Sequence, residues 1–144
     1  MANVIFLKGS GIIKEAVAAA SGILPGHRLD LSLNAGVLEV GVGAAGGAAD
    51  GGRAAFAVEN SEIGYDNTDA YPDNSQVKYL VAHKGDEVLA RAAVGLTWST
   101  GAPLYSAASG QVTDVAGTAV SPIGYALSDV TTSTADLLVP MEVA

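Results

Sequence analysis

The sequence contains no cysteine, little positive charge and few aromatic side chains. The absence of cysteine excludes disulfide bonds, thiolate zinc sites, iron–sulfur clusters and cysteine nucleophiles. The 7 Lys and Arg residues are outnumbered by 15 Asp and Glu residues, and the net charge of −8 argues against binding to nucleic acid or to anionic lipid. Aromatic residues make up 6% of the chain against 49% hydrophobic residues, so we expect a core built mainly from small side chains such as Ala and Val.

Long apolar runs are also absent. The apolar run at the N-terminus, Val4 to Leu7, is too short to cross a membrane and follows no positive charge, so it indicates neither a membrane span nor a signal peptide. We therefore expect a soluble chain that is not secreted. A chain of 144 residues has the usual size of one domain with one core, which we predict at residues 12–144, after an N-terminal arm at residues 1–11.

Hydrophobic and polar residues alternate along most of the chain, as they do in half-buried strands. Residues 29–34 and 37–42 alternate on either side of Asn34-Ala35-Gly36, which predicts a β-hairpin. The Gly- and Ala-rich residues 43–52 predict a surface loop. Further strands are predicted at residues 54–58, 77–83, 87–94, 120–127 and 137–143. Short strands separated by turn residues indicate an all-β protein.

Residues 12–20 have the spacing of a short helix when taken alone. An internal repeat favours a strand there, because Ala16 to Ala19 align with Ala90 to Ala93, 74 residues later. Further aligned pairs are Gly26 with Gly101, Leu29 with Leu104, Gly36 with Gly110, and Phe56 to Asn60 with Tyr125 to Asp129. We expect the two related strand–turn–strand units to close on each other as a small antiparallel β-barrel, which would remove exposed sheet edges.

Two motifs resemble ligand-binding sites, but the residues around each of them are more typical of an ordinary loop. Gly41 to Gly46 matches the dinucleotide-binding pattern G-x-G-x-x-G, yet the following residues 47–52 cannot form the helix that a pyrophosphate requires. Asp66 to Asp69, with Asp73-Asn74, concentrates oxygen ligands suited to calcium. It lacks the glycine and the closing glutamate of an EF-hand loop, so we expect an ordinary Asx-rich turn.

Catalytic groups are not recognisable either. His27 and His83 each lack a second histidine at metal-ligand spacing, and no G-x-S-x-G motif places a serine nucleophile. We therefore expect no enzymatic activity, no cofactor and no metal site.

Several apolar side chains are expected to be buried, either in the barrel or against a partner. The arm residues Asn3, Val4, Ile5, Phe6 and Leu7 include four apolar residues, which would either add a strand to the barrel or bind a partner. Trp98, the single tryptophan, is expected in the core or at an interface. These six residues are our candidates for contacts with another subunit or protein.

A set of short segments stands in a distinctive order along the chain. They are Lys14 to Ala18, Ile23 to Leu29, Phe56 to Asn60, Asp69 to Tyr71, Gly85 to Ala90, Gly101 to Leu104, Gly110 and Ile123 to Leu127. In this order, from about residue 8 onward, the chain resembles the capsid decoration, or cement, proteins of tailed bacteriophages. It departs from their commoner pattern at Tyr71 to Ser75 and in the loop at residues 43–52.

The resemblance implies a β-tulip-type small barrel without catalytic activity. It implies a virion protein, made in the bacterial cytoplasm, that sits on the outer surface of the expanded capsid. It also implies a homotrimer that ties neighbouring major capsid proteins together and so stabilises the head, since a protein that binds only the assembled shell stabilises it by mass action. The alternative is a receptor- or carbohydrate-binding β module of the virion surface, although such a module usually exposes clustered aromatic residues.

Overall fold

The computed structural model describes residues 4–44, 54–116, 121–132, 134 and 136–144. Within these ranges the regular elements are strands and two 3-10 helices, which confirms the all-β class. The strands are β1 (Phe6–Lys8), β2 (Ile12–Ala18), β3 (Leu29–Asn34), β4 (Val37–Val42), β5 (Ala55–Ala57), β6 (Gln76–Val81), β7 (Glu87–Ala92), β8 (Thr97–Trp98), β9 (Pro103–Ser106), β10 (Val112–Thr113), β11 (Gly124–Ala126), β12 (Val130–Thr131) and β13 (Leu137–Val143). The 3-10 helices are η1 (Ser61–Ile63) and η2 (Ala108–Gly110). No helix in the described ranges has the length and apolar character needed to cross a bilayer.

The C-terminal half forms a closed five-stranded barrel in the order β7-β10-β9-β11-β13, in which β13 pairs back onto β7. The β7–β10 pair is parallel, and the other pairs are antiparallel. We call this unit the C-terminal barrel. Strand β1 lies antiparallel beside β7 and adds to its sheet.

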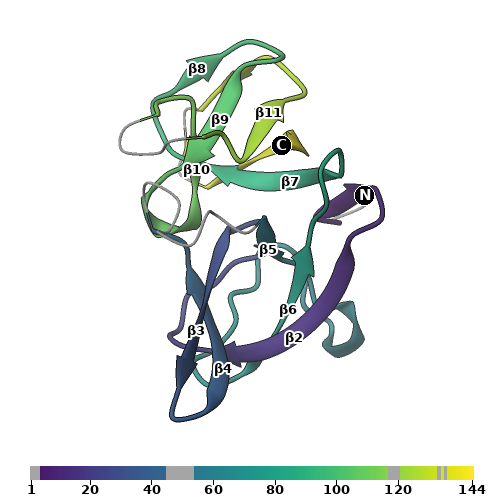
Figure 1. Cartoon of the computed structure of the whole chain (residues 1–144), viewed down its shortest axis with the longest axis vertical. Coiled ribbons are helices and arrows are strands. Elements are labelled where there is room, and N and C mark those ends of the chain that lie inside the picture. The colour runs from purple at the N-terminus through teal and green to yellow at the C-terminus, as the bar shows by residue number, and fades with distance from the viewer. Residues whose placement is uncertain (1–3, 45–53, 117–120, 133, 135) are drawn as a thin grey trace.

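The N-terminal half forms a second five-stranded sheet in the order β3-β4-β2-β6-β5, which we call the N-terminal sheet. Its two outer strands approach each other where a bridge joins Arg28, just before β3, to Phe56 on β5. The N–H group of Ala57 donates to the carbonyl oxygen of His27 at 3.0 Å, and Gly26 donates to the carbonyl oxygen of Ala57 at 2.8 Å. The two units lie one above the other along the long axis of the molecule (Figure 1).

The internal repeat is confirmed, because the two units share both strand order and register. Strands β2, β3, β4, β5 and β6 correspond to β7, β9, β10, β11 and β13. Ala18 is paired with Val40 between the parallel strands β2 and β4, and Ala92 is paired with Val112 between the parallel strands β7 and β10. Backbone hydrogen bonds are equivalent as well. In the N-terminal unit they join Ala19 to Val40, Gly26 to Ala57 and Val58 to Lys78. In the C-terminal unit the corresponding bonds join Ala93 to Val112, Gly101 to Ala126 and Leu127 to Pro140. Residues 12–18 are therefore a strand, as the repeat predicts.

The units close in a different way from the expected one. In each unit the first and last strands pair antiparallel with each other, β2 with β6 and β7 with β13. This pairing occupies strand edges that would otherwise be available to the other unit. Each unit consequently curls on itself. The two meet through side-chain packing and through backbone hydrogen bonds, such as that from Arg28 N–H to the carbonyl oxygen of Gly110 at 2.8 Å.

The strand positions agree largely with the alternation of the sequence. Strands β3, β4, β5, β6, β7, β11 and β13 lie within or close to the predicted ranges. The alternation does not predict β8, β9, β10 and β12, because strands of two to four residues are too short to establish a period.

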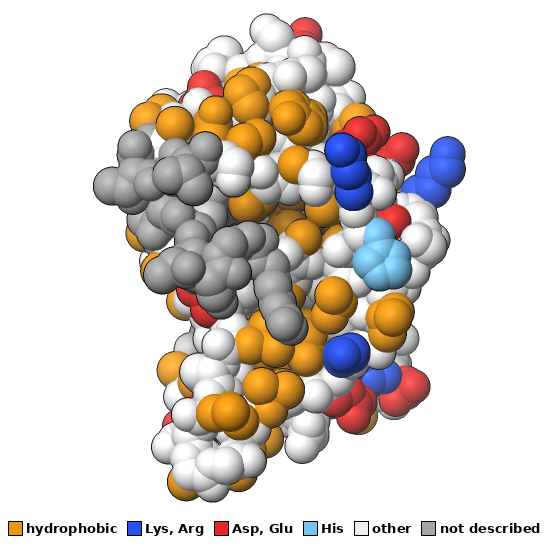
Figure 2. Space-filling model, in the orientation of Figure 1, with side chains coloured by type: hydrophobic (Ala, Val, Ile, Leu, Met, Phe, Trp, Pro, Cys, Tyr) orange, Lys and Arg blue, Asp and Glu red, His pale blue; other side chains and the backbone are white. Residues whose placement is uncertain are grey.

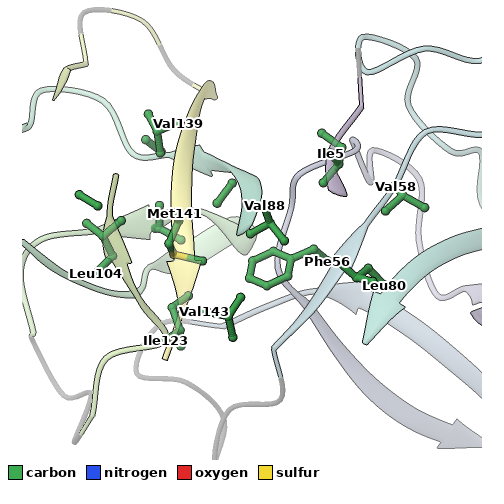
Figure 3. Packing of buried hydrophobic residues seen from close by; sticks show 14 of the residues in the cluster. Ile5, Phe56, Val58, Leu80, Val88, Leu104, Ile123, Val139, Met141 and Val143 are labelled. Atoms are coloured by element: carbon green, nitrogen blue, oxygen red, sulfur yellow. The ribbon is translucent and has the colours of Figure 1, made fainter. Parts of the chain in front are cut away.

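The hydrophobic core has two parts. One lies within the N-terminal sheet and consists largely of small residues together with Tyr71 and Tyr79. The other fills the C-terminal barrel and continues across the junction, where Phe56 from β5 and Leu80 from β6 pack with Val88 from β7. Figure 3 shows the Phe56 ring between the side chains of the two units. Phe56 is fully buried, and the two units therefore share one continuous apolar contact.

Candidate partner-binding surfaces

The N-terminal residues proposed as partner contacts lie along the junction of the two units. Of the two explanations that the sequence leaves open, strand addition applies to β1, which pairs Phe6 with Val88 of β7. Val4 and Leu7 are 40% and 46% exposed, and Phe6 is partly buried. Asn3 lies outside the described residues. Contacts of this segment with a partner remain a prediction.

Ile5 is part of the core. Its side chain is fully buried and belongs to the cluster that contains Phe56 and Val88. Its N–H group donates to Glu59 Oε2 at 3.1 Å, and its carbonyl oxygen accepts from Leu89 N–H at 2.8 Å. Ile5 thus holds the arm in place, while the exposed side chains of Val4 and Leu7 are available to a partner.

Trp98 also lies in the core, which is one of the two positions expected for it. It belongs to β8, opposite Val130 of β12, and only 5% of it is exposed. Its indole Nε1 is buried and makes no hydrogen bond within the described part of the chain. A buried ring cannot serve as an exposed stacking platform for a sugar.

A buried arginine connects the two units. Arg28 is fully buried, and its Nε donates to Ser106 Oγ on β9 at 2.6 Å. Its Nη1 donates to Asp30 Oδ1 at 2.8 Å, and its Nη2 donates to the carbonyl oxygen of Ala44 at 3.2 Å. A buried guanidinium is tolerated only when its donors are satisfied in this way. Arg28 therefore has a structural role.

His27 lies beside this arginine, at the same junction. Its Nδ1 accepts from Leu24 N–H at 3.1 Å, so the ring proton is on Nε2, which lies 3.2 Å from Asp136 Oδ1. Burial lowers the pKa of His27, and the hydrogen bond to Asp136 opposes this only in part. Gln111 Nε2 donates to the same Asp136 oxygen at 2.8 Å. These contacts fix a neutral histidine in a structural position.

The Asp-rich segment forms the Asx turn that its composition predicts. Asp66 Oδ1 accepts from the N–H and the hydroxyl of Thr68, at 2.7 and 2.6 Å, and these bonds lower the pKa of Asp66. Asp69 Oδ2 accepts from Asp66 N–H at 2.9 Å. Among the described residues, no three acidic or histidine side chains form a cluster that could hold a metal ion.

The remaining candidates are also explained by local structure. His83 Nδ1 lies 3.1 Å from Ser10 Oγ, in a turn organised by Asp86, which accepts from the backbone N–H groups of both residues. Burial would raise the pKa of Asp86, but these backbone hydrogen bonds outweigh it and lower the pKa. In the glycine motif, Gly41 belongs to β4, and residues 45–46 lie outside the described residues.

Exposed apolar side chains also lie on the N-terminal sheet, and the alternation of the sequence does not identify them. They are Ile12 and Ile13 on β2, Leu33 on β3, and Val37 and Leu38 on β4, and they are distributed over both faces of the sheet. Leu33 lies directly opposite Leu38 and is 75% exposed, because the β3–β4 hairpin extends beyond the core. The alternation places Leu33 on the same face as the buried Leu29. It does not show at which residue of the strand burial on that face stops. Hydrophobic side chains are visible over this part of the molecule in Figure 2.

One comparison with known proteins identifies a shared fold. No protein-family model and no curated protein matches the sequence. A solved structure that does match is the head fiber gp8.5 N base of bacteriophage phi29, with a TM-score of 0.61 and 13% sequence identity. The similarity covers 94% of this chain and 95% of that one. At this level of identity, it establishes a shared fold.

Proposed function

We propose that this protein is a non-enzymatic decoration, or cement, protein of a phage head. It binds the outer surface of the expanded capsid and bridges neighbouring major capsid proteins. The observation that carries the proposal is the similarity of fold, over nearly the full length of both chains, to the base of a phage head fiber. The order of segments that resembles phage decoration proteins supports it independently.

The chemistry of the described residues is consistent with this role. The residues most suited to catalysis or ligand binding, such as His27, Arg28 and Asp66, make hydrogen bonds that hold the fold together. Apolar side chains are exposed at Val4 and Leu7 and on the β3–β4 hairpin. Such side chains favour a function that depends on burying surface against another protein.

The proposed cement acts by mass action. A protein that binds the assembled shell and not its separated subunits shifts the equilibrium toward the shell. Many copies multiply a modest interface, and a homotrimer, which we propose as the bound form, multiplies it further. The head then resists the pressure of packaged DNA without any covalent bond.

The experiment that tests the proposal measures binding to heads. The purified chain is first examined by gel filtration with light scattering, which gives its oligomeric state. It is then mixed with expanded, undecorated heads of the phage that encodes it, and bound copies are counted after sedimentation. We expect saturable binding that raises the melting temperature of the heads. Failure to bind any capsid state would overturn the proposal and favour the receptor-binding alternative.

A further inference from the structure

The internal repeat allows the edges of equivalent strands to be compared. On β7, three successive outward N–H groups of one edge are satisfied. Ala93 donates to Val112 on β10 at 2.9 Å, Arg91 donates to Gly26 of the N-terminal unit at 3.0 Å, and Leu89 donates to Ile5 beside β1 at 2.8 Å. The edge of β7 is therefore covered along its whole length, and β1 covers its first half.

The equivalent edge of β2 is covered only at its end. Ala19 donates to Val40 on β4 at 2.9 Å, and the ladder with β4 contains only Val17 and Ala18. Because Ala18 donates to Ser75 toward β6 and backbone groups alternate in direction, the N–H groups of Ile13 and Glu15 point away from β6. Within the described ranges, no group accepts from either of them.

The open edge carries exposed apolar side chains. Ile12 and Ile13 on β2 are 53% and 47% exposed and, as successive residues of a strand, point to opposite faces of the sheet. Strand β4 pairs with β2 only from Glu39 onward, so the hairpin extends away from the open edge (Figure 1). An unpaired backbone edge with exposed apolar residues on both sides is suited to accept an additional strand.

We propose that this edge, Ile12 to Glu15 of β2, receives an extended strand of the capsid shell protein. The proposal rests on the cement function proposed above and names its contact. The incoming strand runs antiparallel to β2, as β1 runs antiparallel to the equivalent edge of β7. By the same equivalence, it is mainly apolar and carries no net negative charge, like the sequence Ile5-Phe6-Leu7-Lys8.

A second copy of this chain is a poorer occupant. Each copy carries a net charge of −8, which opposes the pairing of two free copies through this short edge alone, whereas the homotrimer proposed above is also stabilised by its contacts with the head. The strand β1 of a second copy is not available, because its Ile5 is fully buried in its own core. The shell protein is therefore the occupant that we test.

The test uses Glu15→Pro, which removes one of the two outward N–H groups of the open edge. Proline is tolerated at edge positions where the N–H group faces solvent, so we expect a melting temperature close to that of the wild type. Binding to expanded, undecorated heads is expected to weaken by roughly tenfold or more, since main-chain hydrogen bonds provide much of the affinity of an added strand. The matched control Glu15→Gln keeps the N–H group and is expected to bind as the wild type does.

The outcomes are distinguishable. Wild-type binding with equal binding of Glu15→Pro would overturn the strand proposal and leave the cement function intact. Failure of the wild type to bind would overturn both. A dimer of the free chain that depends on this edge would identify a second copy as the occupant and also overturn the proposal.

A second measurement keeps the test valid if Glu15→Pro does not fold. Backbone amide exchange of residues 12–16 in the wild type is compared between the free and the head-bound protein. We expect slower exchange in the bound protein. Unchanged exchange would overturn the proposal.

Discussion

Arg28 and Ser106 belong to different halves of the chain, and a 2.6 Å hydrogen bond from Arg28 Nε to Ser106 Oγ joins them inside the protein. Ser106 Oγ in turn donates to the carbonyl oxygen of Ala44 at 2.9 Å, and the same oxygen accepts from Arg28 Nη2. The junction between the two units is thus held by a polar network as well as by the packing of Phe56. This arrangement makes the network a direct target for mutation.

We expect Arg28→Ala to lower the free energy of unfolding by about 2–4 kcal/mol, because it leaves buried acceptors without a donor and creates a cavity. Urea denaturation measures the change. Lys84→Ala, at an exposed position, is the control and should change stability by less than about 0.5 kcal/mol. Equal stability of the two variants would contradict a structural role for Arg28.

Stability should fall on mild acidification because of His27. Its pKa in the folded protein is lowered from the ordinary value of 6.5, so the unfolded chain binds the proton more readily. The contribution of neutral His27 is therefore complete above pH 6.5 and is lost as the pH falls from 6.5 toward the lower pKa of the folded state. Urea denaturation of the wild type and of His27→Gln at several pH values tests this. Equal pH dependence of both proteins would exclude His27 as the cause.

A separate loss of stability is expected in stronger acid. Burial opposes ionisation of Asp136, but its hydrogen bonds with Gln111 and His27 outweigh burial and lower its pKa from 3.8. Its contribution is present above pH 3.8 and is lost as the pH falls through the lower pKa of the folded state. Asp136→Asn should lessen the loss in this range, and an unchanged acid transition would argue against Asp136.

We expect Phe56→Ala to cost about 3–5 kcal/mol, because the ring is fully buried where the two units meet. Leu33→Ala is the matched control at the tip of the β3–β4 hairpin, where the side chain is 75% exposed. It should cost less than about 1 kcal/mol. Thermal or urea unfolding of both variants measures the difference, and similar costs would show that Phe56 does not anchor the junction.

The aligned glycines Gly36 and Gly110 should respond differently to alanine. Both have positive φ angles, 82° and 71°, so each substitution strains the backbone by about 1 kcal/mol. At Gly110 an added Cβ would also lie 2.8 Å from the carbonyl oxygen of Arg28, whereas at Gly36 it would meet open space. Gly110→Ala should therefore be the more destabilising of the two in urea denaturation. The opposite order would contradict the close packing at the junction.

The arm can be tested without disturbing the core. Deleting residues 1–8 would remove the buried Ile5, so we expect that deletion to lower stability as well as occupancy on heads. Val4→Ser with Leu7→Ser keeps Ile5 and should lower only the occupancy, measured by sedimentation with heads. Val94→Ser, at an exposed position outside the arm, is the control. Unchanged occupancy of the double variant would exclude these two side chains as capsid contacts.

Much of this fold can be predicted from local patterns. The alternation of residues 29–34 and 37–42 specifies the hairpin of β3 and β4, because a period of two depends only on neighbouring residues. The alignment of Ala16 to Ala19 with Ala90 to Ala93 identifies β2 as a strand and predicts two copies of one strand arrangement. The turn chemistry of Asp66 is likewise evident from residue type.

Long-range contacts are not contained in these patterns. The pairing of β2 with β6 and of β7 with β13, the burial of Arg28 beside Ser106, and the exposure of Leu33 all depend on which distant segments meet. Burial and edge pairing belong to the assembled chain, since a residue's neighbours in space are set by the closure of each unit. For this reason the open edge of β2 is defined only by the folded structure, in which β1 covers the equivalent edge of β7.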